Sequence, residues 1–208
     1  MCEEVFEKVK EPERRYALGM ERLKAHDYAG ARECFEHDAD LGFGDAQYRL
    51  AMMYEREWES GHDKKNAEEG FRLMSLAAEN GNMYAQMQLG IYYNIGYGVR
   101  HDEEKSQDFY KRALKQLRIA AKAGDAEALN ALGDYYCVCV VRQDLKKSVE
   151  YWKKAAELGD AQGQFNLGCC YKDGYGELEK DVEKARLWLE KAAAQGHDGA
   201  KEQLRCLY

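Results

Sequence analysis

The sequence has a single proline, Pro12, against nineteen glycines, and it has few runs of β-branched residues. It is rich instead in Ala, Leu, Glu, Lys, Gln and Met, which have high helix propensities. No alternation of apolar and polar residues continues far enough to predict a β-strand. These absences argue against a β-sheet protein, and the composition predicts an all-α fold.

Long hydrophobic runs are also missing. No stretch reaches the roughly 18 apolar residues that a membrane-spanning helix needs. Residues 1–12 form a charged N-terminal segment without an apolar core, unlike a secretory signal peptide. We therefore expect a cytoplasmic protein, although delivery as a secreted effector by a route that uses no signal peptide remains compatible with the sequence.

Acidic residues are spread along the chain. Its 31 Lys and Arg residues are outnumbered by 38 Asp and Glu residues, and the net charge is −7. We see no basic stripe of the kind that neutralises the phosphates of a nucleic acid. The sequence therefore predicts no nucleic-acid partner.

Catalytic signatures are absent as well. The sequence contains no Ser/His/Asp set, no HExxH motif and no P-loop. The histidines fall mostly in or near predicted turns, where a solvated side chain is the expected state: His26, His37, His62, His101 and His197. We expect a protein that is not an enzyme and that binds no cofactor and no metal.

What the sequence does have is an internal repeat. Leu89-Gly90 is followed by Tyr93, and the same trio, with some drift, begins at Leu18, Leu50, Leu132, Leu167 and Leu204. In the last five copies a small residue precedes the Leu by four positions, which is one helical turn. A second motif follows each trio, as in KSVEYWKKAAELG (147–159) and KARLWLEKAAAQG (184–196). Each unit is therefore expected to hold two helices, and the pairs must stack to bury their apolar faces.

The third copy of the second motif, from Lys105 to Gly124, is seven residues longer than its siblings. Seven residues are close to two helical turns, so the apolar face stays in phase through the insertion. We predict one continuous helix over residues 105–123, about 28 Å long at ~1.5 Å per residue, with no break between Ala113 and Leu117.

The repeats predict the domain organisation. Residues 13–208 are expected to form a single repeat domain with unit boundaries that follow the spacing of the Leu anchors. The units are approximately 13–44, 45–81, 82–124, 125–159 and 160–196, followed by a capping helix at 197–208.

The Gly96-Tyr97-Gly98 stretch resembles a phosphate-binding loop. In a dinucleotide fingerprint, however, the glycines follow a strand and open a helix. Here they follow a predicted helix, so we interpret Gly96 as a left-handed helix C-cap and Gly98 as the residue that turns the chain back. Asp102, like Asp144 and Asp181, is expected at the N-cap or first turn of the next helix. The sequence therefore predicts a structural loop.

These motifs resemble the Sel-1-like repeat, a relative of the tetratricopeptide repeat. The third unit carries the family pattern at Ala85, Leu89, Gly90, Tyr93, Gly96, Gly98, Val99, Asp102 and Lys105. The first unit looks more like a tetratricopeptide repeat, and the fourth replaces the glycine loop with CVCVVRQD. The resemblance implies a right-handed α-solenoid superhelix of stacked antiparallel helix pairs. It also implies a role as a scaffold or adaptor for other proteins, with the first helices lining a concave groove.

By analogy with tetratricopeptide repeats, the groove would bind a peptide or helix segment of another protein, and we expect the chain to be a monomer. Apolar residues at groove positions of the first three units favour binding; the alternative is that superhelical curvature buries these residues against each other. The candidate partner-binding residues are Tyr16, Met20, Tyr48, Met52, Tyr84, Met87, Ile91, Asn94, Asn130, Asp134, Phe165 and Cys169.

The seven cysteines are irregularly spaced and are expected to be free thiols. Cys137 and Cys169 lie on predicted neighbouring first helices, so both are candidates to face the groove and form a thiolate site for zinc or copper(I) or a redox site. The spacing is not that of paired C-x-x-C ligands, and buried cysteine commonly acts as a small hydrophobic residue. A thiol- or metal-dependent role is therefore the alternative hypothesis.

Overall fold

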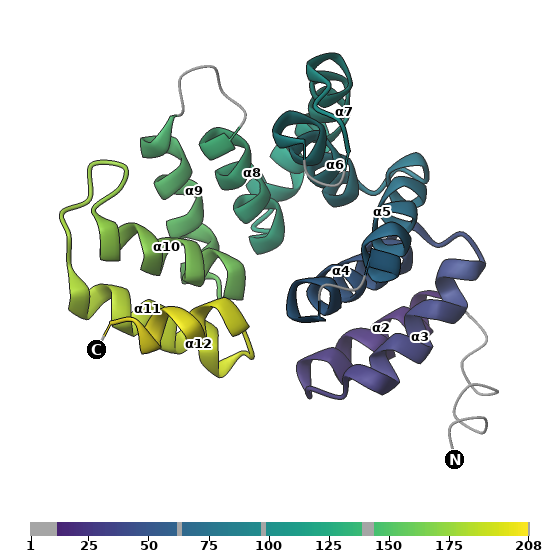
Figure 1. The fold of residues 1–208 in the computed structure, drawn as a ribbon, viewed down its shortest axis with the longest axis horizontal. Helices are drawn as coiled ribbons and strands as arrows, with labels where there is room; N and C mark the ends of the chain where they lie inside the picture. Colours follow the sequence, from purple (N-terminus) through teal and green to yellow (C-terminus); the bar gives the residue numbers. More distant parts are fainter. Residues whose placement is uncertain (1–11, 62–63, 97–98, 139–143, 208) are drawn as a thin grey trace. The chain divides into compact units, whose positions relative to one another are not determined.

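The computed structural model describes residues 12–61, 64–96, 99–138 and 144–207. Within these ranges the chain forms eleven α-helices and no strand (Figure 1), which confirms the all-α prediction. The helices, labelled as in Figure 1, are α2 (Pro12–Lys24), α3 (Tyr28–Asp40), α4 (Gly44–Gly61), α5 (Lys64–Glu79), α6 (Met83–Ile95), α7 (Glu103–Lys122), α8 (Ala126–Val138), α9 (Leu145–Glu157), α10 (Ala161–Asp173), α11 (Val182–Ala194) and α12 (Asp198–Arg205).

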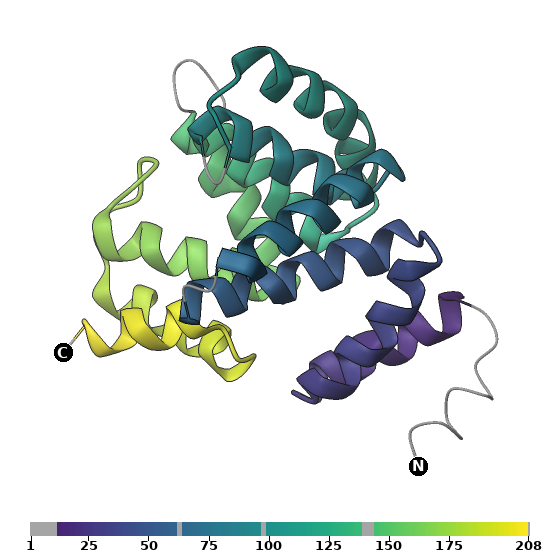
Figure 2. The same ribbon diagram turned by 45° about the vertical axis from the view of Figure 1, so that its right-hand side comes forward.

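The chain divides into two compact units, Met1–Tyr110 and Lys111–Tyr208, and the division falls within α7. In the first unit each helix from α2 to α6 packs against its neighbour in the chain. In the second unit the same is true from α8 to α12. Figures 1 and 2 show a short connection between α11 and α12 and a wider loop between α10 and α11. Local packing of helix pairs is the arrangement of α-solenoid repeats.

The repeated Leu anchors form the layer between the helices. Leu50, Leu89, Leu132 and Leu167 are all at most 4% exposed. The small residue after the anchor permits close approach of the second helix: a Cβ added at Gly133 would lie 2.4 Å from the ring of Trp152 on α9. The Leu-Gly pair is therefore a packing motif, because the leucine fills the layer and the glycine admits the facing aromatic ring.

In three units a Tyr, an Asp and a Lys join the end of the first helix to the start of the second. The backbone N–H of the Asp donates to the carbonyl of the Tyr at 2.8–3.1 Å. The Asp carboxylate accepts from the backbone N–H of the Lys at 2.9–3.1 Å, and the Lys ammonium lies over the Tyr ring. This confirms the predicted N-caps. The three sets are Tyr93, Asp102 and Lys105; Tyr136, Asp144 and Lys147; and Tyr171, Asp181 and Lys184.

Gly96 ends α6 with φ 74°, and its N–H donates to the carbonyl of Tyr92, so it is the predicted left-handed C-cap. Gly98 lies outside the described residues. Because a helix precedes the glycines, the loop lacks the strand-to-helix geometry of a phosphate-binding site. In the fifth unit Gly174 takes the same C-cap position, with φ 80°.

A buried glutamine closes the turn between units. Gln47, Gln86 and Gln164 each precede the Leu anchor by three residues, and each donates from Nε2 to a carbonyl near the end of the preceding second helix, at 3.0–3.3 Å. These bonds satisfy carbonyls that have no partner within the helix. The next unit is therefore joined to the previous one by a side-chain hydrogen bond as well as by apolar packing.

Helix α7 is continuous over 20 residues, whereas α3, α9 and α11 have 13 each. The prediction of one long helix without a break between Ala113 and Leu117 is confirmed. Tyr110, Ala113 and Leu117 are at most 1% exposed, and their spacing of three and four residues places them on one face. The insertion therefore lengthens the helix and keeps its buried face in register.

Candidate functional site

In the first unit, most of the candidate groove residues lie on α4 and α6, and Tyr16 and Met20 lie on α2. Near the N-termini of α4 and α6 Asn82 Nδ2 donates to Asp45 Oδ1 at 2.7 Å, and near their C-termini the Tyr92 hydroxyl donates to Glu55 Oε1 at 2.5 Å. Contacts at both ends mean that residues on this side of the two helices form one continuous surface.

The centre of this surface is a pair of aromatic rings. Tyr48 stacks on Tyr84 with ring centroids 5.7 Å apart and planes 28° apart. Met52 lies one turn beyond Tyr48 and is 36% exposed. Ile91 lies two turns beyond Tyr84 and is half-buried. Residues spaced by four and seven positions share a helix face. Tyr48 is 9% exposed and belongs to the core, so its expected place on an open groove is corrected; its ring supports Tyr84, which is half-buried like Ile91. We call Tyr48, Met52, Tyr84 and Ile91 together the α4–α6 face.

Other candidates in this unit belong to the core or to its edge. Met87 is 2% exposed, so it is a core residue, and its expected place on an open groove is corrected. Close packing of the helices leaves no free surface at this position, as the curvature alternative predicts. Tyr16 packs on Phe35 and Phe43 with ring centroids 5.7 and 5.4 Å away. Met20 borders the same core, and Asn94 is half-buried.

In the second unit, Asn130 and Asp134 belong to a polar network. Asp134 Oδ2 accepts from Asn130 Nδ2 at 3.0 Å, and Asp134 Oδ1 accepts from Trp152 Nε1 at 2.9 Å. Asn166 Nδ2 donates to Asp134 Oδ1 at 3.2 Å and to Asn130 Oδ1 at 3.1 Å. The network therefore ties α8 to both α9 and α10. Sequence reasoning missed Trp152 and Asn166, because no motif in the sequence signals these side-chain bonds.

The environment of Asp134 changes its acidity. Burial raises the pKa of the carboxyl to about 7, and the negative charge of Asp160 acts in the same direction. Hydrogen bonds from Trp152, Asn130 and Asn166 favour the carboxylate and oppose this increase. Desolvation of the charged form outweighs these bonds. Asp134 is therefore a titratable group near neutral pH.

Phe165 and Cys169 lie together beside α12. The Phe165 ring stacks on His197 with centroids 4.5 Å apart, and both Phe165 and Cys169 pack against the cluster of Leu189, Ala192 and Ala200. Both residues are half-buried. They extend the candidate surface of the second unit from α10 toward α12.

The cysteines give no support to the thiolate alternative. Cys137 packs with Trp152 and Cys170 in one cluster, whereas Cys169 packs in another. Burial raises the pKa of the Cys137 and Cys169 thiols, and it raises the pKa of Cys170 to about 12. A protonated thiol is a poor nucleophile and metal ligand. In the part of the chain that the structure describes, no three His, Cys, Asp or Glu side chains are grouped to hold a metal ion.

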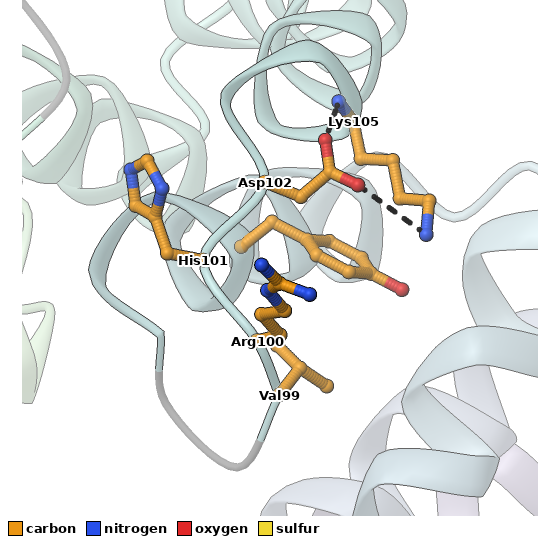
Figure 3. A pocket seen from close by; sticks show the side chains of 6 residues that line it. Val99, Arg100, His101, Asp102 and Lys105 are labelled. Carbon is orange, nitrogen blue, oxygen red and sulfur yellow. Dashed lines mark hydrogen bonds and ion pairs between the residues drawn. The ribbon is translucent and has the colours of Figure 1, made fainter.

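A shallow hollow lies at the loop between α6 and α7 (Figure 3). It is lined by Tyr93, Val99, Arg100, His101, Asp102 and Lys105. Figure 3 shows Asp102 joined to Lys105, while His101 points to the other side of the loop. Lys105 Nζ lies 3.4 Å from Asp102 Oδ2 and 5.2 Å from the centre of the Tyr93 ring. The charged groups here are used to close the loop, so this hollow is part of the repeat structure.

Tandem antiparallel helix pairs, joined by the same loop and turn devices, define a helical-repeat protein of the α-solenoid class. A family model described as Sel1 repeat matches residues 44–82, 84–116, 126–160 and 161–197. These segments cover more than half of the sequence, and the chain belongs to the Sel1 repeat family. Proteins of this family typically mediate protein–protein interactions and are generally not enzymes.

Relatives and solved structures agree with this assignment. The rat protein DAP3-binding cell death enhancer 1 is 32% identical over 191 residues, which cover 92% of this chain and 36% of the rat protein. The chain thus spans about a third of that relative's length. A Sel1 repeat protein from Oxalobacter formigenes superposes with TM-score 0.52 at 25% identity, covering 94% of this chain and 75% of that chain. For a sel1 repeat protein from Klebsiella pneumoniae subsp. pneumoniae the TM-score is 0.57 at 22% identity, over 96% and 94% of the two chains.

No helix among the described residues is long and apolar enough to cross a membrane.

Proposed function

We propose that this chain is a non-catalytic scaffold or adaptor that binds a peptide or helix segment of a partner protein along its first helices. The observation that carries the proposal is the α4–α6 face. Met52 is 36% exposed beside the stacked rings of Tyr48 and Tyr84, and exposed apolar groups that adjoin one another favour a binding surface. Methionine also adapts to partners of different shape.

The proposal accounts for the energetics of binding. Full burial of a side chain such as Met or Ile contributes about 1.5–3 kcal/mol, and Met52 and Ile91 have part of that burial still to gain. A partner side chain inserted beside the Tyr48–Tyr84 stack gains aromatic contact at a small cost in conformational entropy, because these rings are already ordered by packing. Micromolar affinity corresponds to about −8.2 kcal/mol, so further contacts of the partner must supply the larger part of the binding free energy.

The second unit carries candidate residues of its own. Asn130 and Asp134 are engaged in the internal polar network and orient Asn166, while the half-buried Phe165 offers an apolar ring. Such a mixture suits the backbone and side chains of a peptide. The rat relative is named for binding the protein DAP3, which supports a protein as the partner class for this chain. We expect no nucleic-acid partner and a monomeric chain.

The test is the double variant Met52→Glu with Ile91→Glu, and the matched control is Leu158→Glu with Leu187→Glu. The control residues are 57% and 50% exposed and lie in the second unit. Each pair adds two negative charges on exposed or half-buried apolar positions. Proteins captured from a lysate by wild type and by each variant are quantified by mass spectrometry, and thermal unfolding is followed by circular dichroism.

We expect the α4–α6 variant to lose the specific partners that wild type and the control variant both retain, because a buried charge without a partner opposes docking. If Ile91→Glu lowers the melting temperature, the single variant Met52→Glu supplies the comparison. Equal capture by wild type and by a folded Met52→Glu variant contradicts binding at this face.

A further inference from the structure

Helix α7 carries a row of basic residues on its solvent side. Lys111, Lys115, Arg118 and Lys122 follow one another at intervals of four, three and four residues, so they fall on one helix face over about 16 Å at ~1.5 Å per residue. All four side chains are exposed, and the face turned away from them buries Tyr110, Ala113 and Leu117. We call these four residues the α7 basic stripe.

The stripe is unusual in this acidic chain. Residues 109–124 contain no Asp or Glu, although the protein has 38 such residues and a net charge of −7. Several basic residues elsewhere pair with acidic residues three positions away on their own helices, as Arg72 does with Glu69 and Lys201 with Asp198. None of the four stripe residues forms an ion pair with any residue that the structure describes.

The spacing of these cations destabilises helix α7, and the fold does not require it. Like charges at i and i+4 on a helix destabilise it, and the stripe contains two such pairs, Lys111 with Lys115 and Arg118 with Lys122. The favourable interaction of Lys122 with the helix dipole is confined to the last turn. Two of the four residues, Arg118 and Lys122, lie in the part of α7 by which it exceeds the 13-residue second helices.

An exposed apolar residue adjoins the stripe. Ile119 is 63% exposed and stands four residues after Lys115 and three residues before Lys122, which makes it their neighbour on the helix surface. A row of cations with an adjacent apolar side chain is complementary to a helix that carries carboxylates at the same spacing and an apolar residue beside them. Charge complementarity of this kind increases both specificity and association rate.

We propose that the α7 basic stripe is a second interaction surface, which docks an acidic amphipathic helix of a partner protein. The carboxylates of the partner pair with Lys111, Lys115, Arg118 and Lys122, and an apolar side chain of the partner covers Ile119. This surface is separate from the α4–α6 face, and its test does not depend on that face. The four cations are spaced at the intervals of one helix face, and the exposed Ile119 lies beside them, so an acidic helical segment of a protein is the favoured occupant.

The experiment uses the full chain and a synthetic labelled helical peptide with Glu at positions i, i+4, i+7 and i+11 and Leu beside them. A second peptide has Gln in place of each Glu. Binding is measured by fluorescence anisotropy at low ionic strength and again at about 0.5 M salt, where the Debye length falls to a few ångströms. Wild type is compared with Lys115→Glu/Arg118→Glu and with the control Lys153→Glu/Lys180→Glu, whose residues are also exposed. Both double variants change the net charge by the same amount.

We expect wild type and the control variant to bind the Glu peptide and to lose it in high salt. The stripe variant should bind roughly tenfold more weakly or worse, because two attractive pairs become repulsive. Three results overturn the proposal. They are equal binding of the Glu and Gln peptides, equal loss of affinity in both double variants, and tighter binding of duplex RNA or phosphatidylserine vesicles than of the Glu peptide. Circular dichroism confirms that each variant is folded.

Discussion

At the scale of single residues, Asp134 shows how burial changes the chemistry of a side chain. Its carboxyl group accepts three hydrogen bonds, and yet burial raises its pKa to about 7. An unfolded aspartic acid has a pKa near ~3.9. Between these values the folded state binds the proton and the unfolded state does not, so the free energy of unfolding decreases as the pH rises from about 4 to about 7.

Replacement of Asp134 by Asn should remove this dependence on pH. The variant keeps an amide oxygen that accepts from Trp152 Nε1, and it carries no charge to desolvate. We expect the wild type to lose on the order of 2–4 kcal/mol of stability from this group between pH 4 and pH 8, and the variant to lose correspondingly less. Urea unfolding of both proteins over this range provides the measurement, and parallel pH profiles contradict the prediction.

At the scale of elements, the loop between α10 and α11 depends on the backbone of Gly176. Its φ is 64°, and an added Cβ would lie 2.5 Å from Val149 Cγ2 and 2.6 Å from the carbonyl oxygen of Leu145. The loop is thus packed against α9 at a position that admits no side chain. Glycine is required at position 176 because φ is positive and because Val149 and Leu145 leave no space for a Cβ atom.

Substitution Gly176→Val should therefore destabilise the protein by roughly 1–3 kcal/mol. The matched control is the next residue, Glu177, which has φ 71° and is the partner of Lys146 at 2.9 Å on the surface. Glu177→Gly relieves the positive φ and loses an exposed ion pair, so its effect should stay below about 1 kcal/mol. Thermal unfolding compares the two variants, and an unchanged melting temperature for Gly176→Val would refute this account of the loop.

At the scale of the whole molecule, a repeat array is stabilised by contacts between neighbours in the chain. A core mutation should then weaken its own part of the array more than a distant part. Phe35 on α3 is fully buried in the core of the first unit. Replacement of Phe35 by Ala should lower the free energy of unfolding by about 3–5 kcal/mol.

We expect Phe35→Ala to increase hydrogen exchange in α2, α3 and α4 and to leave the protection of α10, α11 and α12 unchanged. Hydrogen exchange followed by mass spectrometry measures both regions in one experiment. A uniform increase over all helices would show that the chain unfolds as one cooperative block.

The sequence by itself determined the repeated part of the structure. Three features recur in the sequence: the Leu anchors, the glycines and the capping aspartates. The insertion in α7 keeps its apolar residues in phase with the helical repeat. Each of these features could therefore be predicted from spacing alone. The physical reason is that helix periodicity, left-handed C-caps and N-caps depend on residues close in the chain.

Only the tertiary structure decided which groove candidates are accessible and what surrounds them. Met52 is exposed and Met87 is buried, although both are methionines on first helices, because exposure depends on neighbouring helices that the local pattern does not describe. Asp134 meets Trp152 and Asn166, which are 18 and 32 residues away in the chain. The α7 basic stripe is interrupted in the sequence by other residues, and it is a single surface because the helix turns Ala113 and Leu117 into the core and leaves the four cations on the opposite side.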